Sequence, residues 1–305
     1  SRQPGSRAAR APSMRPSRLL AAGWALGAAT QAAEEPWAPC CDEGALIACA
    51  NASAPLVAAS GRAPRWSRPR FLVMQLATPN LWDSFCGYTA ALNAAWARRH
   101  GHRYLLTDGA FLDRSDLWRG GNVRAVLEVM RQVDEDVDWV FHLDCDAALV
   151  DASGADALAA ALAAVSGHEE VVLSRDETGF AGASRLANMG TGLWRRSAWT
   201  SGLLEAWWGE LRADPHVNEQ EVLERLLLRN ESGCQDRLVF LPAGRLNSES
   251  ANPIAAPPER QPVVHLAGMP DEVRGRVFGA AWAELCAASP QTPPGHGALL
   301  RGDGW

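Results

Sequence analysis

Two acidic residues separated by one residue follow an apolar run near the middle of the chain. They are Asp144 and Asp146, and the run that precedes them is 138–143. A short run of β-branched and aromatic residues predicts a buried strand, and open α/β sheets bind their ligands where such strands end. Carboxylate oxygens are ligands for Mg²⁺ or Mn²⁺, and such ions often carry substrate phosphates as well. A solvated turn is the alternative that these residues alone leave open.

Two further side chains could take part in the same chemistry. Glu219 opens a predicted helix on the face that carries Val222 and Leu226, so its carboxylate is expected to point inward. It could act on a ligand, or it could only stabilise the positive end of the helix. His265 lies in the short apolar run 263–268. A histidine in such a run is more often a satisfied core residue than a ligand.

Alternating strands and helices surround these groups and must position them. Apolar runs alternate with helical patterns at the spacing of βαβ units, which predicts an α/β fold with a central, mainly parallel mixed sheet flanked by helices. The first helix is expected to begin at an N-cap of Asp83 or Ser84 and to end before Gly101. The predicted strands are 71–76, 104–108, 138–143, 170–174, 188–195 and 263–268, and the further helices are 123–133, 155–165, 197–211 and one that opens at 218–221.

The composition excludes some classes of function. With 305 residues and 47% hydrophobic content, the chain can bury a sizeable core. Its formal net charge of −6 argues against non-specific nucleic-acid binding, which needs a positive surface. All 29 basic residues are Arg, so any mechanism that requires a catalytic Lys is excluded.

Composition also divides the chain into four segments. Residues 1–33 are predicted to be a basic leader with a signal peptide or a weak signal-anchor, since Arg15 and Arg18 precede the apolar run 19–29. That run is short for a membrane span, so at most a single N-terminal anchor is expected. The other segments are a linker or stem at 34–68, a folded domain at 69–289 and a C-terminal tail at 290–305.

The cysteines and two glycosylation sequons agree with a secretory leader. Seven cysteines are typical of a protein in an oxidising compartment. Cys145 lies inside the acidic motif and is expected to be unpaired. Asn51 and Asn230 begin Asn-X-Ser sequons, which predict N-glycosylation in such a compartment. The cysteines left for disulfides, in a connectivity that the sequence does not give, are Cys40, Cys41, Cys49, Cys86, Cys234 and Cys286.

Five stretches, taken in order, resemble the GT-A glycosyltransferases, which have the Rossmann-like nucleotide-diphospho-sugar transferase fold. The likeness is strongest to family 34, the galactosyl-, mannosyl- and xylosyltransferases. It implies that 69–289 is a GT-A catalytic domain that works in the secretory pathway, in the Golgi lumen or alternatively in the ER lumen or outside the cell. The matching stretches are 95–104, the acidic motif at 138–147, the Asn-X-Gly strand at 188–199, the helix start at 219–223 and the His segment at 265–268.

The resemblance also implies roles for the candidate residues. Asp144, Asp146 and His265 would hold Mn²⁺ or Mg²⁺ against the diphosphate of a UDP- or GDP-linked sugar. Glu219 and Gln220 would be the catalytic side chains, and the family transfers its sugar to a glycan or glycoconjugate with retention of anomeric configuration. The implied contacts with the nucleotide sugar are Thr78, Asp108, Arg119, Asn122, Asn188, Gly190 and Gln220.

One position departs from the pattern of the family. A Lys is expected on the helix ahead of the acidic motif, whereas Arg119, Asn122 and Arg124 occupy that neighbourhood. Arg can bind a phosphate bidentately, but its geometry differs from the point charge of a Lys. The departure therefore bears on how tightly the donor binds.

Two other functions share parts of this pattern. Haloacid-dehalogenase-type phosphatases also place Asp-X-Asp after an apolar strand, but that strand comes first in their chains, and they need a later Lys. Here two strands precede the motif, Ala148 stands where those phosphatases have Thr or Val, and Lys is absent. A non-catalytic protein of the GT-A fold that binds carbohydrate or nucleotide sugar is the other alternative, since thirteen Trp side chains could stack on sugars. The complete set of candidate residues favours catalysis.

Overall fold

The computed structural model describes residues 69–77, 81–107, 114–150, 154–175, 187–248 and 261–288, and of 114–119 it describes the backbone only. The predicted leader, stem and tail lie outside these ranges. All of the described residues belong to one compact unit, Trp37–Trp305. Among them, no helix combines the length and the hydrophobicity that crossing a bilayer requires.

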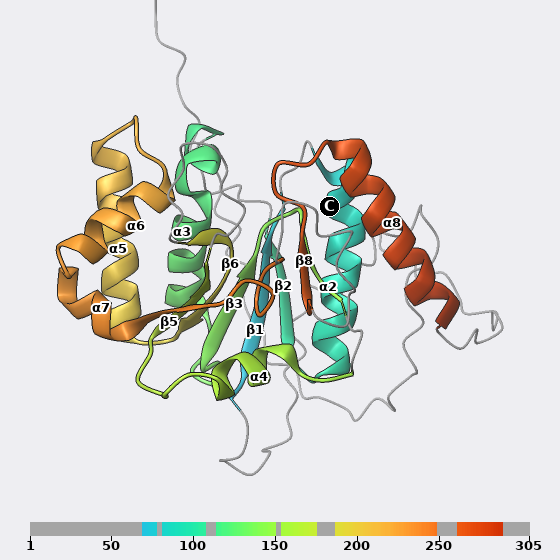
Figure 1. Cartoon of the computed structure of the whole chain (residues 1–305), viewed down its shortest axis with the longest axis horizontal. Helices are drawn as coiled ribbons and strands as arrows, with labels where there is room; N and C mark the ends of the chain where they lie inside the picture. The colour runs from blue at the N-terminus through green and yellow to red at the C-terminus, as the bar shows by residue number, and fades with distance from the viewer. Residues whose placement is uncertain are drawn as a thin grey trace, which may run out of the picture. The chain divides into compact units, whose positions relative to one another are not determined.

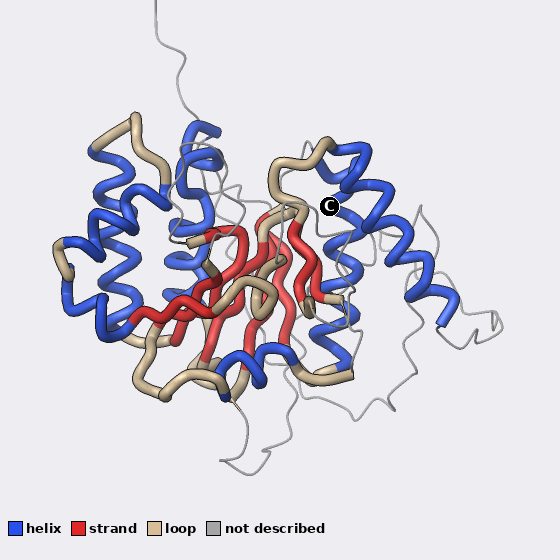
Figure 2. Tube along the Cα trace, in the orientation of Figure 1, coloured by secondary structure: helices blue, strands red, loops and turns tan. Residues whose placement is uncertain are grey.

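A six-stranded sheet forms the centre of this unit (Figure 1, Figure 2). In spatial order, its strands are β2 (Arg103–Thr107), β1 (Phe71–Leu76), β3 (Trp139–Leu143), β6 (Asn188–Arg195), β5 (Val171–Ser174) and β7 (Leu238–Leu241). β1 is parallel to both β2 and β3, and β5 is parallel to β7. β6 lies between β3 and β5 and is antiparallel to both. The expected α/β fold with a mainly parallel mixed sheet is therefore confirmed.

Helices cover both faces of the sheet. Successive residues of a strand point to opposite faces, so each strand places side chains against both layers of helices. In β1, Leu72 and Met74 belong to one hydrophobic cluster, whereas Phe71 and Val73 belong to another. This burial on both faces explains why β1 is apolar almost throughout. The helices on the first side are α3 (Arg114–Gln132), α5 (Ala198–Ala213), α6 (Glu219–Leu228) and α7 (Cys234–Arg237), and those on the second are α2 (Gly87–Arg99) and α4 (Ala157–Ala163).

Two short strands form a second sheet that brings distant parts of the chain together. They are β4 (Ala147–Leu149) and β8 (Val263–His265), which pair antiparallel with Ala147 opposite His265. With three residues, β4 is too short to give a recognisable pattern in the sequence. The strand expected at 263–268 ends at His265, and this pairing places His265 beside the acidic motif.

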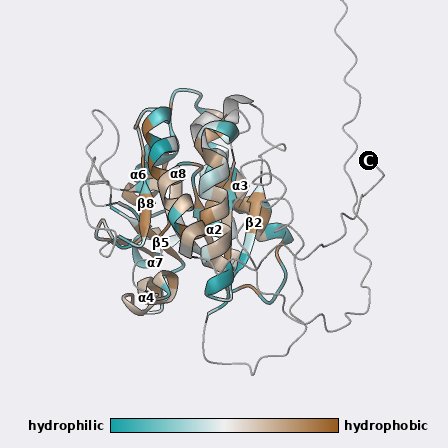
Figure 3. Ribbon diagram, turned by 90° about the vertical axis from the view of Figure 1, so that its right-hand side faces the viewer, coloured by the Kyte–Doolittle hydropathy of each residue, from teal (hydrophilic) through white to brown (hydrophobic). Residues whose placement is uncertain are grey.

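A long helix near the C-terminal end is absent from the sequence-based expectation. α8 (Asp271–Ala288) lies beside α2 (Figure 3). It also contacts the short π-helix η3 (Trp82–Cys86). The approach to η3 is close, because a Cβ on Gly275 would lie 2.6 Å from the backbone oxygen of Ser84. Gly and Ala make up much of this helix, so its apolar periodicity is weak and gave no signal.

The start of the first helix also differs from the prediction. Neither Asp83 nor Ser84 caps it, because η3 comes first and α2 follows from Gly87 with no side-chain cap. The Ser84 hydroxyl instead donates to the Leu81 carbonyl at 3.0 Å. The predicted cap is wrong because η3 continues directly into α2, so the first N–H groups of α2 need no capping side chain.

The helix ahead of the acidic motif is longer than expected. α3 begins at Arg114 rather than near residue 123, and Gly120 interrupts its helical geometry with a φ of 157°. A side chain at this position would also collide with Leu211 of α5. Gly120 therefore allows the helix to kink without ending, and Asn122 stands near the start of the second part.

A disulfide joins the acidic motif to η3, which corrects the expectation that Cys145 is unpaired. Cys145 is bonded to Cys86, with 5.3 Å between the two Cα atoms. The expectation is wrong because the side chain between the two acidic residues is buried on the side where η3 lies. Cys286 is also disulfide-bonded, as expected. Cys234 was expected to be available for a disulfide, but it is a free, buried thiol whose Sγ lies 3.3 Å from the Leu226 carbonyl oxygen.

Removing the disulfide is expected to destabilise the fold measurably. It closes a loop with a sequence separation of 59, so the variant Cys86→Ser/Cys145→Ser should lose about 2–4 kcal/mol of unfolding free energy. Urea unfolding under non-reducing conditions measures the change. Cys234→Ala is the control, since it removes a thiol but no cross-link. Equal midpoints for the double variant and the wild type would contradict the expectation.

Candidate functional site

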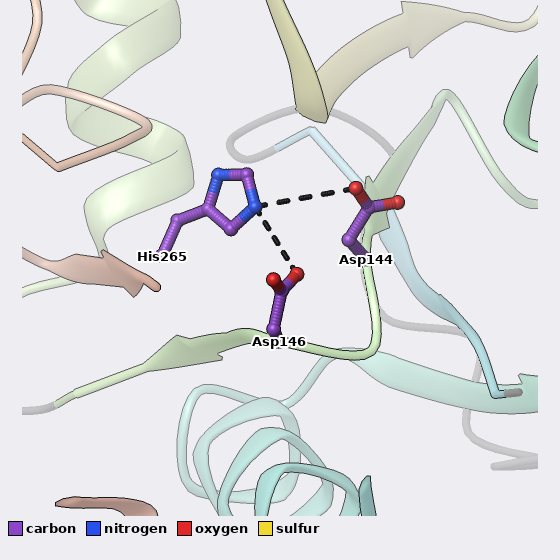
Figure 4. A group of neighbouring side chains, drawn as sticks. All are labelled: Asp144, Asp146 and His265. Carbon is purple, nitrogen blue, oxygen red and sulfur yellow. Dashed lines mark hydrogen bonds and ion pairs between the residues drawn. The ribbon is translucent and has the colours of Figure 1, made fainter. Parts of the chain in front are cut away.

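Three predicted ligands meet where β3 ends (Figure 4). Asp144 and Asp146 lie in the turn between β3 and β4, and His265 is the last residue of β8. Each of the three residues offers one ligand atom, and these three atoms lie within 4.8 Å of one another, so the group could hold a metal ion. His265 Nε2 is 3.1 Å from Asp146 Oδ1 and 4.0 Å from Asp144 Oδ2.

Backbone hydrogen bonds hold the turn against its neighbours. The Asp144 N–H donates to the Gly190 carbonyl at 2.8 Å, and the Leu266 N–H donates to the Asp146 carbonyl at 3.0 Å. The first bond ties the motif to β6, and the second ties it to the segment after β8. The motif is therefore bonded on one side to β6, which carries Asn188 and Gly190, and on the other side to the residue that follows His265.

Gly190 has a geometric reason to be a glycine. A Cβ at this position would overlap the His265 ring, so the imidazole lies directly over the backbone of β6. The Asn188 Oδ1 accepts a hydrogen bond from the Gly190 N–H at 2.9 Å. In the Asn-X-Gly segment, the glycine leaves space for the imidazole and the asparagine fixes the backbone beside it.

One oxygen of each carboxylate is held by a neighbouring side chain. Asn122 Nδ2 donates to Asp144 Oδ1 at 2.6 Å, and Arg274 Nη2 lies 2.9 Å from Asp146 Oδ2. The oxygens that remain are Asp144 Oδ2 and Asp146 Oδ1, and these are the two that lie toward His265. Both carboxylates thus offer a single oxygen to the space between the three residues.

Asn247 defines which nitrogen of His265 carries a hydrogen. Its Oδ1 accepts the Ser248 N–H at 2.8 Å, so this atom is an acceptor, and His265 Nδ1 lies 3.1 Å from the same oxygen. Nδ1 must then donate, which leaves the lone pair of Nε2 in the neutral ring facing two carboxylate oxygens. The three atoms repel one another unless a proton or a metal cation lies between them. Two carboxylate oxygens and one imidazole nitrogen are ligand atoms that suit a divalent cation.

The closeness of these groups shifts the pKa values of all three. Burial and the nearby charge of Asp146 raise the pKa of Asp144 to about 7. Burial alone would also raise the pKa of Asp146, but His265 and Arg274 outweigh it and hold that pKa below its ordinary value. Burial opposes protonation of His265, yet the Asp146 carboxylate raises its pKa overall. The group as a whole attracts positive charge.

A buried polar network of β1 and α2 side chains holds the turn in place. The Thr89 hydroxyl lies 2.8 Å from the Cys145 carbonyl oxygen and accepts a hydrogen bond from Gln75 Nε2 at 2.8 Å. Asn93 Nδ2 donates to the Ala147 carbonyl at 3.0 Å, and Asn93 Oδ1 accepts from the Leu149 N–H at 2.7 Å. Gln75, Thr89 and Asn93 are fully buried, so these bonds are made away from water and position the motif firmly.

Sequence reasoning missed the residues that support the ligands. Polar side chains inside a predicted apolar strand or helix face, such as Gln75 and Asn93, are a signal that could have revealed the network. Asn247 and Arg274 gave no such signal, because their partners are distant in sequence and no predicted element contained them.

Glu219 is the first residue of α6 and is half-buried. The cap of α6 is made by Asn218 and Glu221, which form a capping box, so Glu219 is not needed for that purpose. Burial raises its pKa, and its charge contributes to the raised pKa of Asp144. The backbone oxygen of Glu219 accepts a hydrogen bond from Trp207 Nε1 at 3.0 Å, which fixes the helix start, and Gln220 follows in the first turn.

The structure describes only some of the other residues that were predicted to contact the nucleotide sugar. Thr78 and Asp108 lie outside the described residues, and the Arg119 side chain does as well. Arg124, which shares the neighbourhood of the expected Lys, forms an ion pair with Glu128 at 2.5 Å and lies over the Trp208 ring. The contacts of Arg124 are therefore made with neighbouring helical residues on that side of the sheet.

Comparison with known proteins gives likeness in structure rather than in sequence. No protein-family model matches the chain, and no curated protein matches its sequence. The crystal structure of a glycosyltransferase involved in the glycosylation of the major capsid of PBCV-1 is similar with a TM-score of 0.56 and 12% identity, covering 70% of this chain and 100% of that one. The galactosyltransferase LgtC, in complex with donor and acceptor sugar analogues, gives a TM-score of 0.43 and 16% identity over 73% of this chain and 98% of its own.

A third solved structure is the apo form of the glycosyltransferase GlyE from Streptococcus pneumoniae TIGR4. It gives a TM-score of 0.44 and 15% identity over 72% of this chain and 63% of its own. The likeness to the PBCV-1 enzyme extends over the whole of that structure. Together with the strand order, it shows that this chain has the GT-A fold that the sequence led us to expect.

The contact between Gly190 and His265 leads to a prediction for metal binding. Gly190→Ala should push the imidazole away from the two carboxylates and lower the affinity for Mn²⁺ by about tenfold or more. The loss of the EPR signal of free Mn²⁺ on titration with protein measures the affinity.

Gly202→Ala is the matched control, since a Cβ there meets nothing within 4 Å. It should leave Mn²⁺ binding unchanged. Equal Mn²⁺ affinity in the Gly190 and Gly202 variants would show that the position of His265 does not matter for the ion.

Proposed function

We propose that this chain is a metal-dependent, retaining glycosyltransferase that uses a nucleotide sugar. It would move a hexosyl or pentosyl group from a UDP- or GDP-linked donor to a glycan or glycoconjugate acceptor, as the resemblance to family 34 suggests. One observation carries the proposal: in a GT-A fold, Asp144 Oδ2, Asp146 Oδ1 and His265 Nε2 converge at the end of β3. Ligand sites of α/β sheets lie at such strand ends.

The three converging atoms would hold Mn²⁺ or Mg²⁺. Each residue offers one atom, so positions remain on an octahedral ion for phosphate oxygens of the donor. A divalent ion bound there supplies Lewis-acid neutralisation of the charge on the leaving nucleoside diphosphate. Asn122 and Arg274 hold the outer oxygens of the carboxylates, and Asn247 keeps Nε2 of His265 available for coordination.

Further residues would bind the donor. In this proposal Asn188, Gly190 and Gln220 contact the donor sugar, and the carboxylate of Glu219 lies near the anomeric carbon. Positive charge develops on that carbon during glycosyl transfer, and a preorganised carboxylate stabilises it. The contribution of the Glu219 charge to the raised pKa of Asp144 supports this placement. Thr78, Asp108 and Arg119 complete the proposed nucleotide-sugar contacts, with Asn122 acting through Asp144.

We place this activity in the secretory pathway, most simply in the Golgi lumen. The Cys86–Cys145 disulfide supports an oxidising compartment. Asn230, which begins a sequon, is exposed and therefore reachable for glycosylation. The predicted leader at 1–33 would direct the chain there as a cleaved signal or a single anchor.

A donor-hydrolysis screen tests the activity. The wild type is incubated with UDP- and GDP-sugars and Mn²⁺, and release of nucleoside diphosphate is measured. Turnover with at least one sugar is expected, and Asp146→Ala should abolish it because one ligand is lost. Absence of both turnover and donor binding for every sugar would refute catalysis, and equal turnover in EDTA would refute the role of the metal.

Glu219 offers a separate test of the catalytic assignment. Glu219→Gln keeps size and hydrogen bonding but removes the charge, so kcat for the active donor should fall by about a hundredfold, while Mn²⁺ binding persists. Glu224→Gln, on the same helix, is the matched control and should leave kcat unchanged. A Glu219→Gln variant with wild-type kcat would remove Glu219 from the catalytic residues.

A further inference from the structure

One guanidinium links the C-terminal helix to the metal-ligand cluster. Arg274 of α8 lies with its Nη2 2.9 Å from Asp146 Oδ2, and the side chains of these two residues are only 15% and 14% exposed. The contact is made with the oxygen that does not lie toward His265, because the other oxygen, Oδ1, is 3.1 Å from the His265 Nε2. Arg274 thus determines which oxygen of Asp146 is available to a cation.

Contacts other than Asp146 hold the guanidinium in place. Arg274 Nε donates to the Leu266 carbonyl at 3.1 Å, and Nη1 lies 3.1 Å from Asp271 Oδ1. The guanidinium carbon lies 5.1 Å from the centre of the buried Phe85 ring, within the range of a cation–π contact. The planar group is therefore fixed on several sides and does not depend on Asp146 for its position.

The other carboxylate is restricted in the same way. Asn122 Nδ2 donates to Asp144 Oδ1 at 2.6 Å. With both outer oxygens engaged, the protein offers two single oxygens and one imidazole nitrogen. This arrangement suits a small octahedral ion, whereas Ca²⁺ prefers 6–8 oxygen ligands that often include bidentate carboxylates.

We propose that Arg274 is a positioning residue that keeps Asp146 monodentate and thereby selects Mn²⁺ or Mg²⁺ over Ca²⁺. The proposal rests on the metal site of the proposed function and adds a determinant of its ion selectivity. The positive charge of Arg274 opposes all divalent cations alike. The ratio of affinities for two ions therefore isolates the geometric effect from the charge effect.

The test is a titration of the full chain with Mn²⁺ in the absence of any donor. The EPR signal of free Mn²⁺ gives its affinity, and competition by Ca²⁺ gives the second affinity. Arg274→Met frees Asp146 Oδ2, so the preference for Mn²⁺ over Ca²⁺ should fall by at least about tenfold. Arg274→Lys, which can still reach Asp146 with a charge, should restore part of the preference.

Arg276→Met is the matched control, because Arg276 is exposed on the same helix and carries the same charge. It should leave both affinities unchanged. If Arg274→Met does not fold, Asp271→Asn serves instead. Asp271 is 46% exposed, and its loss removes one anchor of the guanidinium, so the ion preference should fall in the same direction by a smaller factor.

The outcomes separate this inference from the proposed function. An unchanged ratio in Arg274→Met, or an equal gain in affinity for both ions, overturns the positioning role while the metal site stands. A wild type that binds no Mn²⁺ contradicts the metal site of the proposed function and this inference together. A fall in the ratio with Arg274→Met but not with Arg276→Met supports the role.

Discussion

The crowding of two carboxylates and one imidazole nitrogen around a single small space is the constraint on which the site depends. At the separations seen here, two negative charges repel by roughly 3–4 kcal/mol in an environment of intermediate dielectric, and the lone pair of the His265 Nε2 adds to this. The surrounding structure must hold the three groups together in spite of that repulsion. Asn122, Arg274 and Asn247 do so from outside, because each engages the atom of its ligand that lies away from the shared space.

The fold supplies these restraints from distant parts of the chain. His265 is 119 residues from Asp146 in sequence, and the pairing of β4 with β8 closes that distance. The turn between β3 and β4 is hydrogen-bonded to β6 and to the buried polar network of α2, and a disulfide joins it to η3. η3 in turn carries the Phe85 ring beneath Arg274. The acidic motif is therefore the point at which the sheet, α2 and α8 are joined.

The sequence predicted the elements whose pattern is local and failed where structure depends on distant partners. The strand at 71–76 is found at the expected residues, because burial on both faces makes it continuously apolar. β4 and α8 were missed, since one is very short and the other has few large apolar residues. The position of Cys145 inside an acidic motif suggested an unpaired thiol, but its neighbours in space, not in sequence, decide its pairing. Asn247 and Arg274 became recognisable only once β8 and α8 were placed beside the motif.

The contact between Gly190 and His265 has a consequence for how this sequence can change over time. Because the imidazole lies against the backbone of β6, with no space for a Cβ, the two positions are not independent. A larger residue at 190 becomes acceptable only after the ring at 265 has been replaced by something smaller, and that replacement removes a donor from the cluster. Substitutions at these two positions are therefore expected to occur together and in a fixed order.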